Sequence, residues 1–314
     1  MPSPPAVSII IAAYNCAAFI HETLQSVFAQ RFRDFEIIVV NDGSTDQTEA
    51  VLLRYQEQIR YYRQENRGPA GARNTGLRFA RGRYVALLDN DDLWAPDYLE
   101  KMVDRLEARP ETGLIYPNAV LFGSPRWEGR LFQDIYPSSA PVTLEKLITR
   151  ECNVFASCLF RRELVTRFGL FDETLPRGVD DYDFWLRLAR RGVRMEFTPE
   201  PLVRYRKREN ALSMNGLEMT RGAIRIYEKL LAEAETTPEQ REMIGKQVER
   251  LSAEADRMLG KRLIAEGKFA NAVHYLQRAN LYERSLKIRL LTLSLNIAPR
   301  LVARFLPSQE ARTR

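Results

Sequence analysis

Short apolar runs alternate with stretches of helical spacing along the first part of the chain, and this alternation constrains the fold more than any other feature. The runs at residues 7–13, 35–40 and 84–88 carry few polar side chains, which is typical of strands buried on both faces. A shorter strand is expected at residues 59–63, and residues 16–30 have the spacing of a helix. Strands that alternate with helices form a mostly parallel sheet with right-handed crossovers, so the sequence predicts an α/β fold.

Polar side chains close three of these strands. They are Tyr14 and Asn15 after the first strand, Asn41 and Asp42 after the second, and Asp89, Asn90, Asp91 and Asp92 after the last. Parallel strands bring their carboxyl ends to one edge of a sheet, where open α/β sheets bind ligands. The clustered carboxylates of the last strand repel one another, so they need a cation such as Mg²⁺ or Mn²⁺, which also binds substrate phosphates. Taken alone, the cluster also fits a solvated turn that caps the helix expected near Pro96.

After residue 114 the alternation loosens, and a loop rich in Gly and Pro is expected at residues 123–140. Further helices are expected at residues 143–149 and 180–191, and further strands at residues 156–160 and 202–206. Ser44 and Gln47 have the spacing of a capping box for a helix through about residue 59. Beyond about residue 217 only helical spacing remains, with one helix-turn-helix pattern at residues 261–280. The sequence therefore predicts a first domain over residues 1–214 and a helical region over residues 215–314.

The bulk composition of the 314 residues favours a globular cytoplasmic protein. A hydrophobic fraction of 45% is sufficient for a full core. No apolar run approaches the roughly 20 residues that span a bilayer. The first five residues lack the basic segment of a signal peptide, so none is expected. Cys16, Cys152 and Cys158 have no metal-type spacing, and so few cysteines are typical of a reducing compartment.

The net charge of +6 belongs to the C-terminal segment. Residues 284–314 hold seven basic residues and one acidic residue, which leaves 40 of each sign in the rest of the chain. Because the body of the protein is neutral, a nucleic-acid-binding surface over the main domain is not expected.

Residues 284–306 have the pattern of an imperfect amphipathic helix with basic residues beside its apolar positions. One side carries Leu286, Leu290, Leu293, Ile297 and Leu301, and a second side carries Ile288, Leu291 and Leu295. Pro299 lies within this segment and should break or kink the helix. Basic amphipathic helices are attracted to anionic lipid surfaces, so peripheral membrane contact through residues 284–306 is one expectation. The alternative is a terminal helix packed on its own domain.

Six sequence blocks resemble, in order and at familiar spacing, the motifs of glycosyltransferase family 2. They lie at residues 7–15, 37–46, 66–76, 87–94, 162–173 and 178–188. The resemblance covers about residues 6–206 and implies an inverting nucleotide-sugar transferase of GT-A fold. It implies a nucleotide-binding half at about residues 6–114 and an acceptor half at about residues 115–214.

Carried over by position, the resemblance assigns the residues at the strand ends. Ala13, Tyr14 and Asn15 would line the nucleobase pocket, Asp42 would contact the base, and Arg73 would be the cation beside the nucleotide. Asp89, Asn90 and Asp91 form the Asp-x-Asp motif of the family, and Asp91 and Asp92 would contact ribose, metal and diphosphate.

The block at residues 178–188 resembles the one that holds the catalytic base of the family. Asp181 matches the base, but Asp180 replaces the usual preceding Glu, so the sequence leaves open which carboxylate acts. Many relatives also carry a His after the Tyr-Arg pair of the last strand. Here Lys207 and Arg208 follow Arg206, and one of them would meet the phosphate directly.

Two functions remain open at this stage. The first is inverting transfer of a sugar from a nucleotide diphosphate donor, with UDP favoured over GDP or dTDP by family habit. The acceptor would be a hydroxyl of a glycan, a polysaccharide or a lipid-linked oligosaccharide, and the enzyme would work in the cytoplasm or on the inner face of the membrane. The second is a non-catalytic sugar-nucleotide-binding scaffold that acts through its C-terminal helices. A dehydrogenase is disfavoured, since no Gly-x-Gly-x-x-Gly follows the first strand.

Overall fold

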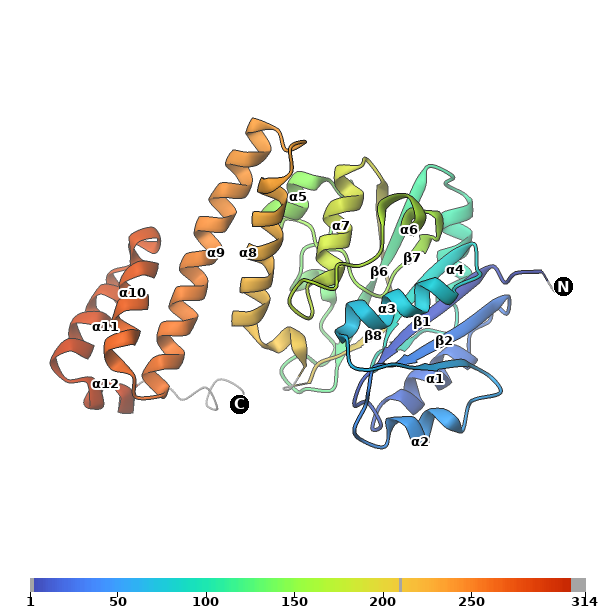
Figure 1. Ribbon diagram of the computed structural model, residues 1–314, viewed down its shortest axis with the longest axis horizontal. Coiled ribbons are helices and arrows are strands. Elements are labelled where there is room, and N and C mark those ends of the chain that lie inside the picture. Colours follow the sequence, from blue (N-terminus) through green and yellow to red (C-terminus); the bar gives the residue numbers. More distant parts are fainter. Residues whose placement is uncertain (1–2, 209–210, 306–314) are drawn as a thin grey trace. The chain divides into compact units, whose positions relative to one another are not determined.

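The computed structural model describes residues 3–208 and 211–305. The chain divides into two compact units, Met1–Ala211 and Leu212–Arg314, which we call the sheet unit and the helical unit. The sheet unit is an α/β fold with a mixed, mostly parallel sheet flanked by helices, and the helical unit contains helices alone among its described residues (Figure 1). The predicted fold class is therefore confirmed.

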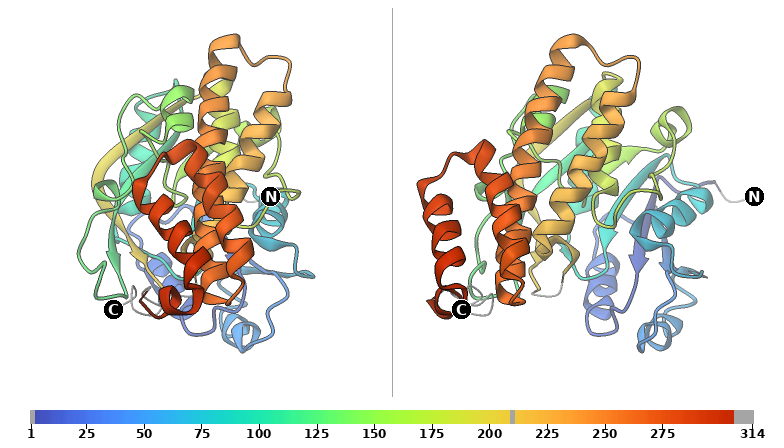
Figure 2. Two further views of the ribbon diagram at one scale, coloured as in Figure 1. Left: turned by 90° about the vertical axis from the view of Figure 1, so that its left-hand side faces the viewer. Right: turned by 60° about the vertical axis from the view of Figure 1, so that its left-hand side comes forward.

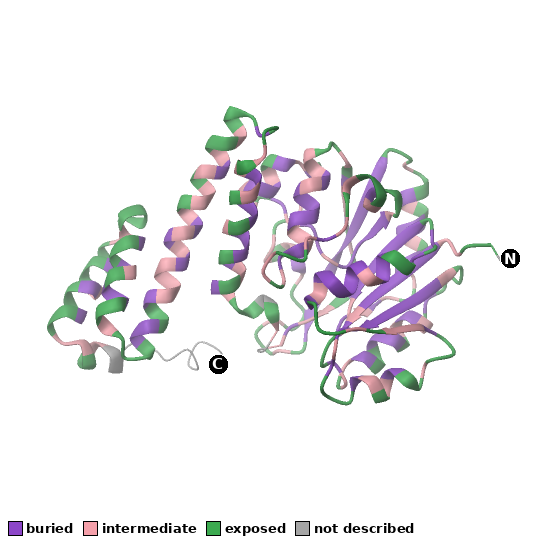
Figure 3. Cartoon of the chain, viewed as in Figure 1, coloured by how far each residue is buried: buried purple, intermediate pink, exposed green. Residues whose placement is uncertain are grey.

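The first four predicted strands form the parallel part of an eight-stranded sheet with the order β3-β2-β1-β4-β7-β6-β8-β5, and the strands predicted at residues 156–160 and 202–206 lie in its second part. The first four are β1 (Val7–Ala13), β2 (Phe35–Asn41), β3 (Arg60–Arg63) and β4 (Tyr84–Asp89). All four run parallel to their neighbours within this part of the sheet. Figure 3 shows that the central strands are buried over most of their length, as their runs of apolar residues predict.

The second part of the sheet mixes both strand directions. It contains β5 (Leu93–Trp94), β6 (Thr112–Phe122), β7 (Leu159–Arg161) and β8 (Arg194–Arg206). Strand β7 runs antiparallel to both β4 and β6, whereas β6 and β8 are parallel and form the longest pairing of the sheet. Strand β7 thus joins the two parallel parts.

Strand β6 was not predicted from the sequence, although its eleven residues are buried along almost the whole strand. Gly113, Pro117 and Asn118 interrupt the apolar run, and these residue types are depleted in strands. The pairing with β8 shifts register next to each of these three positions. Such irregularities are where a sheet accommodates a proline, which cannot donate a ladder hydrogen bond. The Asn118 side chain accepts a hydrogen bond from the backbone nitrogen of Gln133 at 3.2 Å and so ties the following loop to the strand.

The helices of the sheet unit lie between its strands in the sequence and flank the sheet in space. They are α1 (Ile20–Phe28), α2 (Thr48–Leu53), α3 (Gly68–Phe79), α4 (Tyr98–Glu107), α5 (Leu144–Thr149), α6 (Glu163–Phe168) and α7 (Asp180–Arg190). The predicted capping box for α2 is wrong. Asp46, not Ser44, bonds the first turn, since its carboxylate accepts from the backbone nitrogen of Thr48 at 2.9 Å. Ser44 instead accepts a hydrogen bond from the backbone nitrogen of Asn15 at 3.1 Å.

Helix α3 lies unusually close to β1, because Gly76 faces Ile10 without a side chain. A Cβ atom at position 76 would lie 2.5 Å from the Cγ2 atom of Ile10, which is itself fully buried. The position of α3, and with it the position of Arg73, therefore depends on this glycine.

In the helical unit each helix packs against the next one along the chain (Figures 1 and 2). The helices are α8 (Gly216–Ala232), α9 (Pro238–Ala265), α10 (Phe269–Glu283), α11 (Leu286–Ile297) and α12 (Pro299–Phe305). The predicted helix-turn-helix is the α9–α10 pair, with Gly267 in the left-handed region between them at φ 74°. No helix among the described residues is long and apolar enough to cross a bilayer.

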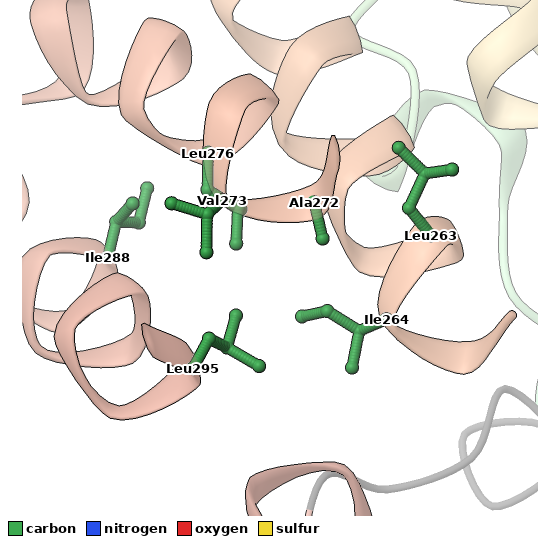
Figure 4. Close-up of a cluster of buried hydrophobic side chains, with 7 residues drawn as sticks. All are labelled: Leu263, Ile264, Ala272, Val273, Leu276, Ile288 and Leu295. Atoms are coloured by element: carbon green, nitrogen blue, oxygen red, sulfur yellow. The ribbon is translucent and has the colours of Figure 1, made fainter. Parts of the chain in front are cut away.

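A small apolar core holds α9, α10 and α11 together (Figure 4). It consists of Leu263, Ile264, Ala272, Val273, Leu276, Ile288 and Leu295. Two of these residues, Ile288 and Leu295, belong to the predicted second side of the tail, and Leu291 packs against the same cluster. Helix α11 ends at Ile297 and α12 starts at Pro299, so the predicted break at that proline is confirmed.

We expect Gly76→Ala to destabilise the sheet unit by about 1–3 kcal/mol, because the added methyl group forces α3 away from β1. The matched control is Gly245→Ala in α9, where an added Cβ meets nothing within 4 Å. That change should stabilise the helical unit by about 0.5–1 kcal/mol. All three tryptophans lie in the sheet unit, so denaturant unfolding followed by fluorescence reports that unit, and helical circular dichroism reports both. An unchanged fluorescence midpoint for Gly76→Ala would contradict the close packing.

Candidate active site

The three polar strand ends lie side by side at one edge of the sheet, as predicted. Strand β1 lies between β2 and β4, and all three are parallel. Ala13 pairs with Asn41, and Ala12 pairs with Asp89. The Asn90 side chain donates a hydrogen bond to the carbonyl oxygen of Ala12 at 2.7 Å, which fixes the loop after β4 against β1.

The loop after β1 presents one exposed aromatic side chain on a rigid backbone. Ala13 is buried, whereas the Tyr14 side chain is 43% exposed. Asn15 lies in the left-handed region at φ 45°, which an asparagine tolerates better than most residues. The Asn15 side chain accepts a hydrogen bond from the backbone nitrogen of Thr45 at 2.8 Å and thus links this loop to the loop after β2. An exposed ring on such a support can stack on a planar base.

Asp42 is buried and held by a chain of polar side chains that the sequence analysis did not identify. Its Oδ1 atom accepts hydrogen bonds from the Gln64 side chain at 2.7 Å and from the backbone nitrogen of Arg67 at 2.8 Å. Gln64 accepts in turn from the Thr75 hydroxyl at 2.6 Å. These partners come from the segment after β3 and from α3, so only the fold brings them to the end of β2.

Arg73 connects the end of strand β4 with the start of helix α7. Its guanidinium group is buried and donates to Asp180 at 2.6 Å and to Asp89 at 2.9 Å. Asp89 closes β4, and Asp180 opens α7, so one side chain of α3 connects both elements. The two acidic partners raise the pKa of Arg73, against the opposing effect of its burial, so it stays charged.

The two candidate base residues at the start of α7 have different surroundings. Asp180 is 1% exposed and ion-paired to Arg73, and its Oδ1 atom has no hydrogen-bond partner among the described residues. Asp181 is half-buried and accepts a hydrogen bond from the backbone nitrogen of Tyr182 at 2.7 Å. Burial and the negative charge of Asp180 raise the pKa of Asp181 to about 7. A carboxylate of this pKa can accept a proton near neutral pH.

Asp91 and Asp92 lie under a cluster of basic residues from the end of β8. The Asp91 Oδ2 atom accepts from Arg208 at 2.6 Å, and the Asp92 Oδ1 atom accepts from the backbone nitrogen of Arg206 at 2.9 Å. Asp92 is fully buried, and its Oδ2 atom has no partner in the part of the chain that the structure describes. Burial and, next, the charge of Asp91 raise the pKa of Asp92 well above its usual range. Burial also raises the pKa of Asp91, although Arg208 opposes this.

The residues that occupy the expected His position of the family divide into two roles. Arg208 lies on Asp91, at the acidic cluster. Lys207 is buried among aromatic rings instead, with its Nζ atom 4.2 Å from the ring centre of Tyr205 and 5.2 Å from that of Tyr136. Burial lowers the pKa of Lys207 to about 8. Of the two cations, Arg208 is thus the one beside the Asp-x-Asp motif.

This edge of the sheet can hold a divalent cation only if a bound diphosphate supplies further oxygen atoms to the ion. No group of three His, Cys, Asp or Glu side chains in residues 3–208 and 211–305 is arranged to hold a metal by itself. Burial raises the pKa of Asp91 and Asp92, and the Oδ2 atom of Asp92 has no partner among the described residues, so a further cation would stabilise their charged forms. A cation shared with a diphosphate would compensate that charge, which is the usual mode for Mg²⁺.

We expect the Asp181→Asn variant to have a higher melting temperature than the unchanged protein at pH 8. Folding raises the pKa of this carboxyl, so the stability that it contributes is complete below about pH 4, the ordinary value for Asp. That contribution is lost as the pH rises through about 7. Asparagine is always neutral and avoids the loss, so the gain should vanish in acid. Asp183→Asn is the control, since Asp183 is ion-paired to Arg187 at 2.8 Å and its loss should destabilise. A pH-independent difference for Asp181→Asn would contradict this account.

Comparison with known sequences identifies relatives of the chain. Residues 8–169 match glycosyl transferase family 2. The chain is 32% identical over 240 residues to the putative teichuronic acid biosynthesis glycosyltransferase TuaG of Bacillus subtilis. The aligned region covers 72% of this chain and 88% of TuaG. It is 28% identical over 212 residues to the UDP-Glc:alpha-D-GlcNAc-diphosphoundecaprenol beta-1,3-glucosyltransferase WfaP of Escherichia coli, with 67% of this chain and 80% of that protein covered. A glycosyltransferase of Rickettsia bellii is 34% identical over 201 residues, but the match spans only 28% of its length and 59% of this chain.

Solved structures share the fold at lower identity. The mannosyltransferase PcManGT from Pyrobaculum calidifontis, in complex with GDP-Man and Mn²⁺, has a TM-score of 0.61 at 24% identity and covers 100% of this chain and 84% of its own. S. aureus TarS in complex with UDP-GlcNAc has a TM-score of 0.59 at 19% identity, with 95% of this chain and 89% of that chain covered. These structures show the fold, whereas the family follows from the sequence match, which spans more than half of the chain. The chain belongs to glycosyl transferase family 2.

Proposed function

We propose that this chain transfers a sugar from a nucleotide diphosphate donor to an acceptor hydroxyl with inversion at the anomeric carbon. The observation that carries the proposal is the Arg73 bridge between Asp89 and Asp180. Through it, the donor side of the sheet edge and the base-bearing helix α7 form one polar site. A pure binding scaffold has no need for a carboxylate of raised pKa beside that site.

The donor would lie along the ends of β1, β2 and β4. Tyr14 would stack on the nucleobase beside Ala13 and Asn15, and Asp42 would accept a hydrogen bond from the base. Since Arg73 already bonds two carboxylates, we assign it to hold Asp89 and Asp180 in place beside the nucleotide. We propose UDP as the nucleotide, in keeping with UDP-GlcNAc in TarS and UDP-Glc in the name of the E. coli relative.

Asp181 would act as the base. Its pKa of about 7 suits removal of a proton from the acceptor hydroxyl at neutral pH, a step that typically contributes about 10²–10⁴ in rate. Asp180 is buried against Arg73, so we assign it as a positioning residue that raises the pKa of Asp181 and fixes the start of α7. Attack from the side opposite the leaving diphosphate inverts the configuration.

Mg²⁺ or Mn²⁺ would be held by Asp91 and Asp92, with Asp89 beside them and the donor phosphates as further ligands. When bound, the ion stabilises the negative charge that develops on the leaving diphosphate. In this structure the Arg208 guanidinium group donates to the Asp91 carboxylate. On binding of the ion, Asp91 would exchange this partner for the ion, and Arg208 would then contact the donor phosphate.

For the acceptor we propose a lipid-linked glycan, as in the name of the E. coli relative, in the synthesis of a polysaccharide of the cell envelope. A lipid-linked acceptor requires the enzyme to reach a membrane surface, and we propose that residues 284–306 make this peripheral contact. Of these, residue 306 lies outside the described residues. The three cysteines are free and buried, which supports a reducing compartment and hence the cytoplasmic side of the membrane.

We expect UDP to stabilise the protein in the presence of Mn²⁺ and much less in the presence of a chelator. UDP at about a hundred times its Kd adds about 2.7 kcal/mol to the free energy of unfolding, which a thermal-shift assay detects. Asp91→Ala should remove most of the metal-dependent part. Asp104→Ala, an exposed carboxylate on α4, is the control and should leave the shift unchanged. Equal shifts with and without chelator would count against a metal-assisted donor site.

We expect Asp181→Asn to bind UDP almost normally but to lower sugar transfer by at least about 10²-fold, because the side chain keeps its size and loses its basicity. The measurement is transfer from a panel of UDP-sugars to undecaprenyl-diphosphate-linked acceptors, with UDP binding followed separately. If Asp181→Asn retains activity while Asp180→Asn abolishes it, the base is Asp180. If neither change affects turnover, the chain is a binding scaffold instead.

A further inference from the structure

Helix α11 is apolar on two opposite sides, although only one side packs on its own unit. Ile288, Thr292 and Leu295 are buried, with Ile288 and Leu295 in the core shown in Figure 4. At 3.6 residues per turn, four other apolar residues fall on the opposite side of the helix. They are Leu286, Leu290, Leu293 and Ile297, which we call the outer stripe.

The outer stripe is exposed to solvent. Leu286 is 68% exposed, Leu290 55%, Leu293 53% and Ile297 84%. Leu281 at the end of α10 and Leu301 of α12 are exposed as well. Seven of the twelve large apolar side chains that are exposed in the described part of the chain lie between residues 281 and 301. Scattered exposed leucines need no explanation, but a contiguous group of this kind marks an interaction surface.

The charges around the stripe identify the kind of partner. No acidic residue occurs from residue 284 to residue 305, whereas Arg284, Lys287, Arg289 and Arg300 are exposed. Lys287 and Arg289 fall on the two flanks of the stripe at helical spacing. A second copy of this chain would place cations against cations, so a symmetric pairing through the stripe is disfavoured. A flat anionic surface with an apolar interior matches both the stripe and its flanks.

A basic groove lies on one flank of α11, between this helix and α9. It has a volume of about 470 Å³, and its lining includes Arg250, Arg257, Lys261 and Lys287. Two carboxylates line it as well: Glu254 is ion-paired to Arg250, and Glu283 is ion-paired to Arg257. The groove therefore carries an excess of positive charge, and Lys287 belongs both to it and to the flank of the stripe.

We infer that the outer stripe of α11 lies in the surface of an anionic bilayer while the groove between α9 and α11 receives the phosphate of a lipid headgroup. The stripe residues enter the boundary between headgroups and acyl chains, and the flanking cations remain at the phosphate level. This inference deepens the peripheral membrane contact that we propose above for residues 284–306, and it goes beyond the proposed sugar transfer. It rests on the helical unit alone, so it stands or falls independently of the donor site.

The test is co-sedimentation of the full chain with vesicles of phosphatidylcholine alone or mixed with phosphatidylglycerol. We expect binding to the anionic vesicles that weakens as salt is added, because exposed charges are screened. Leu290→Gln combined with Leu293→Gln should weaken binding at least about tenfold, since two leucines no longer enter the apolar layer. The matched control is Leu53→Gln combined with Leu212→Gln, two leucines that are exposed elsewhere, and it should bind as the unchanged protein does.

The groove is tested with two lysines of α9. Lys261 lines the groove, whereas Lys246 lies outside it. Lys261→Gln should weaken binding to the anionic vesicles about fivefold, the factor equivalent to about 1 kcal/mol per cation, and Lys246→Gln should not. Equal effects of the two changes would overturn the headgroup site, because only net charge would then matter.

Two results would overturn the inference as a whole. One is wild-type vesicle binding by the Leu290/Leu293 double variant. The other is a stable dimer in sedimentation equilibrium that this variant dissociates, because the stripe would then be an interface between two copies. UDP-induced thermal shifts of every variant should remain those of the unchanged protein, so a failure here is distinguishable from a failure of the donor site.

Discussion

The buried ion pairs of Arg73 are the interaction on which the rest of the site depends. Two carboxylates from separate elements, Asp89 and Asp180, bond the same guanidinium group, which compensates the negative charge of both. Removing the cation would leave the buried negative charge of Asp180 uncompensated and the half-exposed Asp89 without its partner. The loss of the partner of a buried charge is far more costly than the net gain from forming the pair. The bridge therefore contributes less to the overall stability than to the relative positions of β4 and α7.

That bridge also produces an unequal distribution of charge along the first turn of α7. Asp180 is bound to Arg73, and Asp183 is bound to Arg187, so the charge of each is neutralised by a specific partner. Asp181 lies between them, and for it the unfavourable effects of burial and of Asp180 outweigh the attraction of Arg73. Three acidic residues in one turn thus have different electrostatic surroundings because their partners differ, and the helix N-terminus favours negative charge at all three.

The sequence was sufficient to predict the parallel half of the sheet and the meeting of its polar strand ends. The apolar runs and their alternation with helical segments are local patterns, and parallel strands bring their carboxyl ends to one edge. It was also sufficient to predict that α11 carries two separate apolar sides and that the helix breaks at Pro299. Strand β6 could not be predicted, since Gly113, Pro117 and Asn118 conceal a strand whose irregularities are absorbed by pairing with β8. The partners of Asp42 and Arg73 could not be predicted either. Gln64, Thr75 and Asp180 approach them only through tertiary contacts, and no local pattern reports such contacts.

The short side chain of Asp180 has an evolutionary consequence. Its carboxylate oxygen lies 2.6 Å from Arg73 in a fully enclosed position. The glutamate of the family motif would extend the carboxylate by roughly one carbon–carbon bond, about 1.5 Å, into that contact. Overpacking of this size costs about 1–3 kcal/mol unless α3 or α7 moves. Helix α3 in turn has no freedom to move towards β1, because Gly76 already brings them into contact. We therefore expect positions 73, 76 and 180 to be epistatic, so that the effect of a longer acidic side chain at position 180 depends on the helix that faces it.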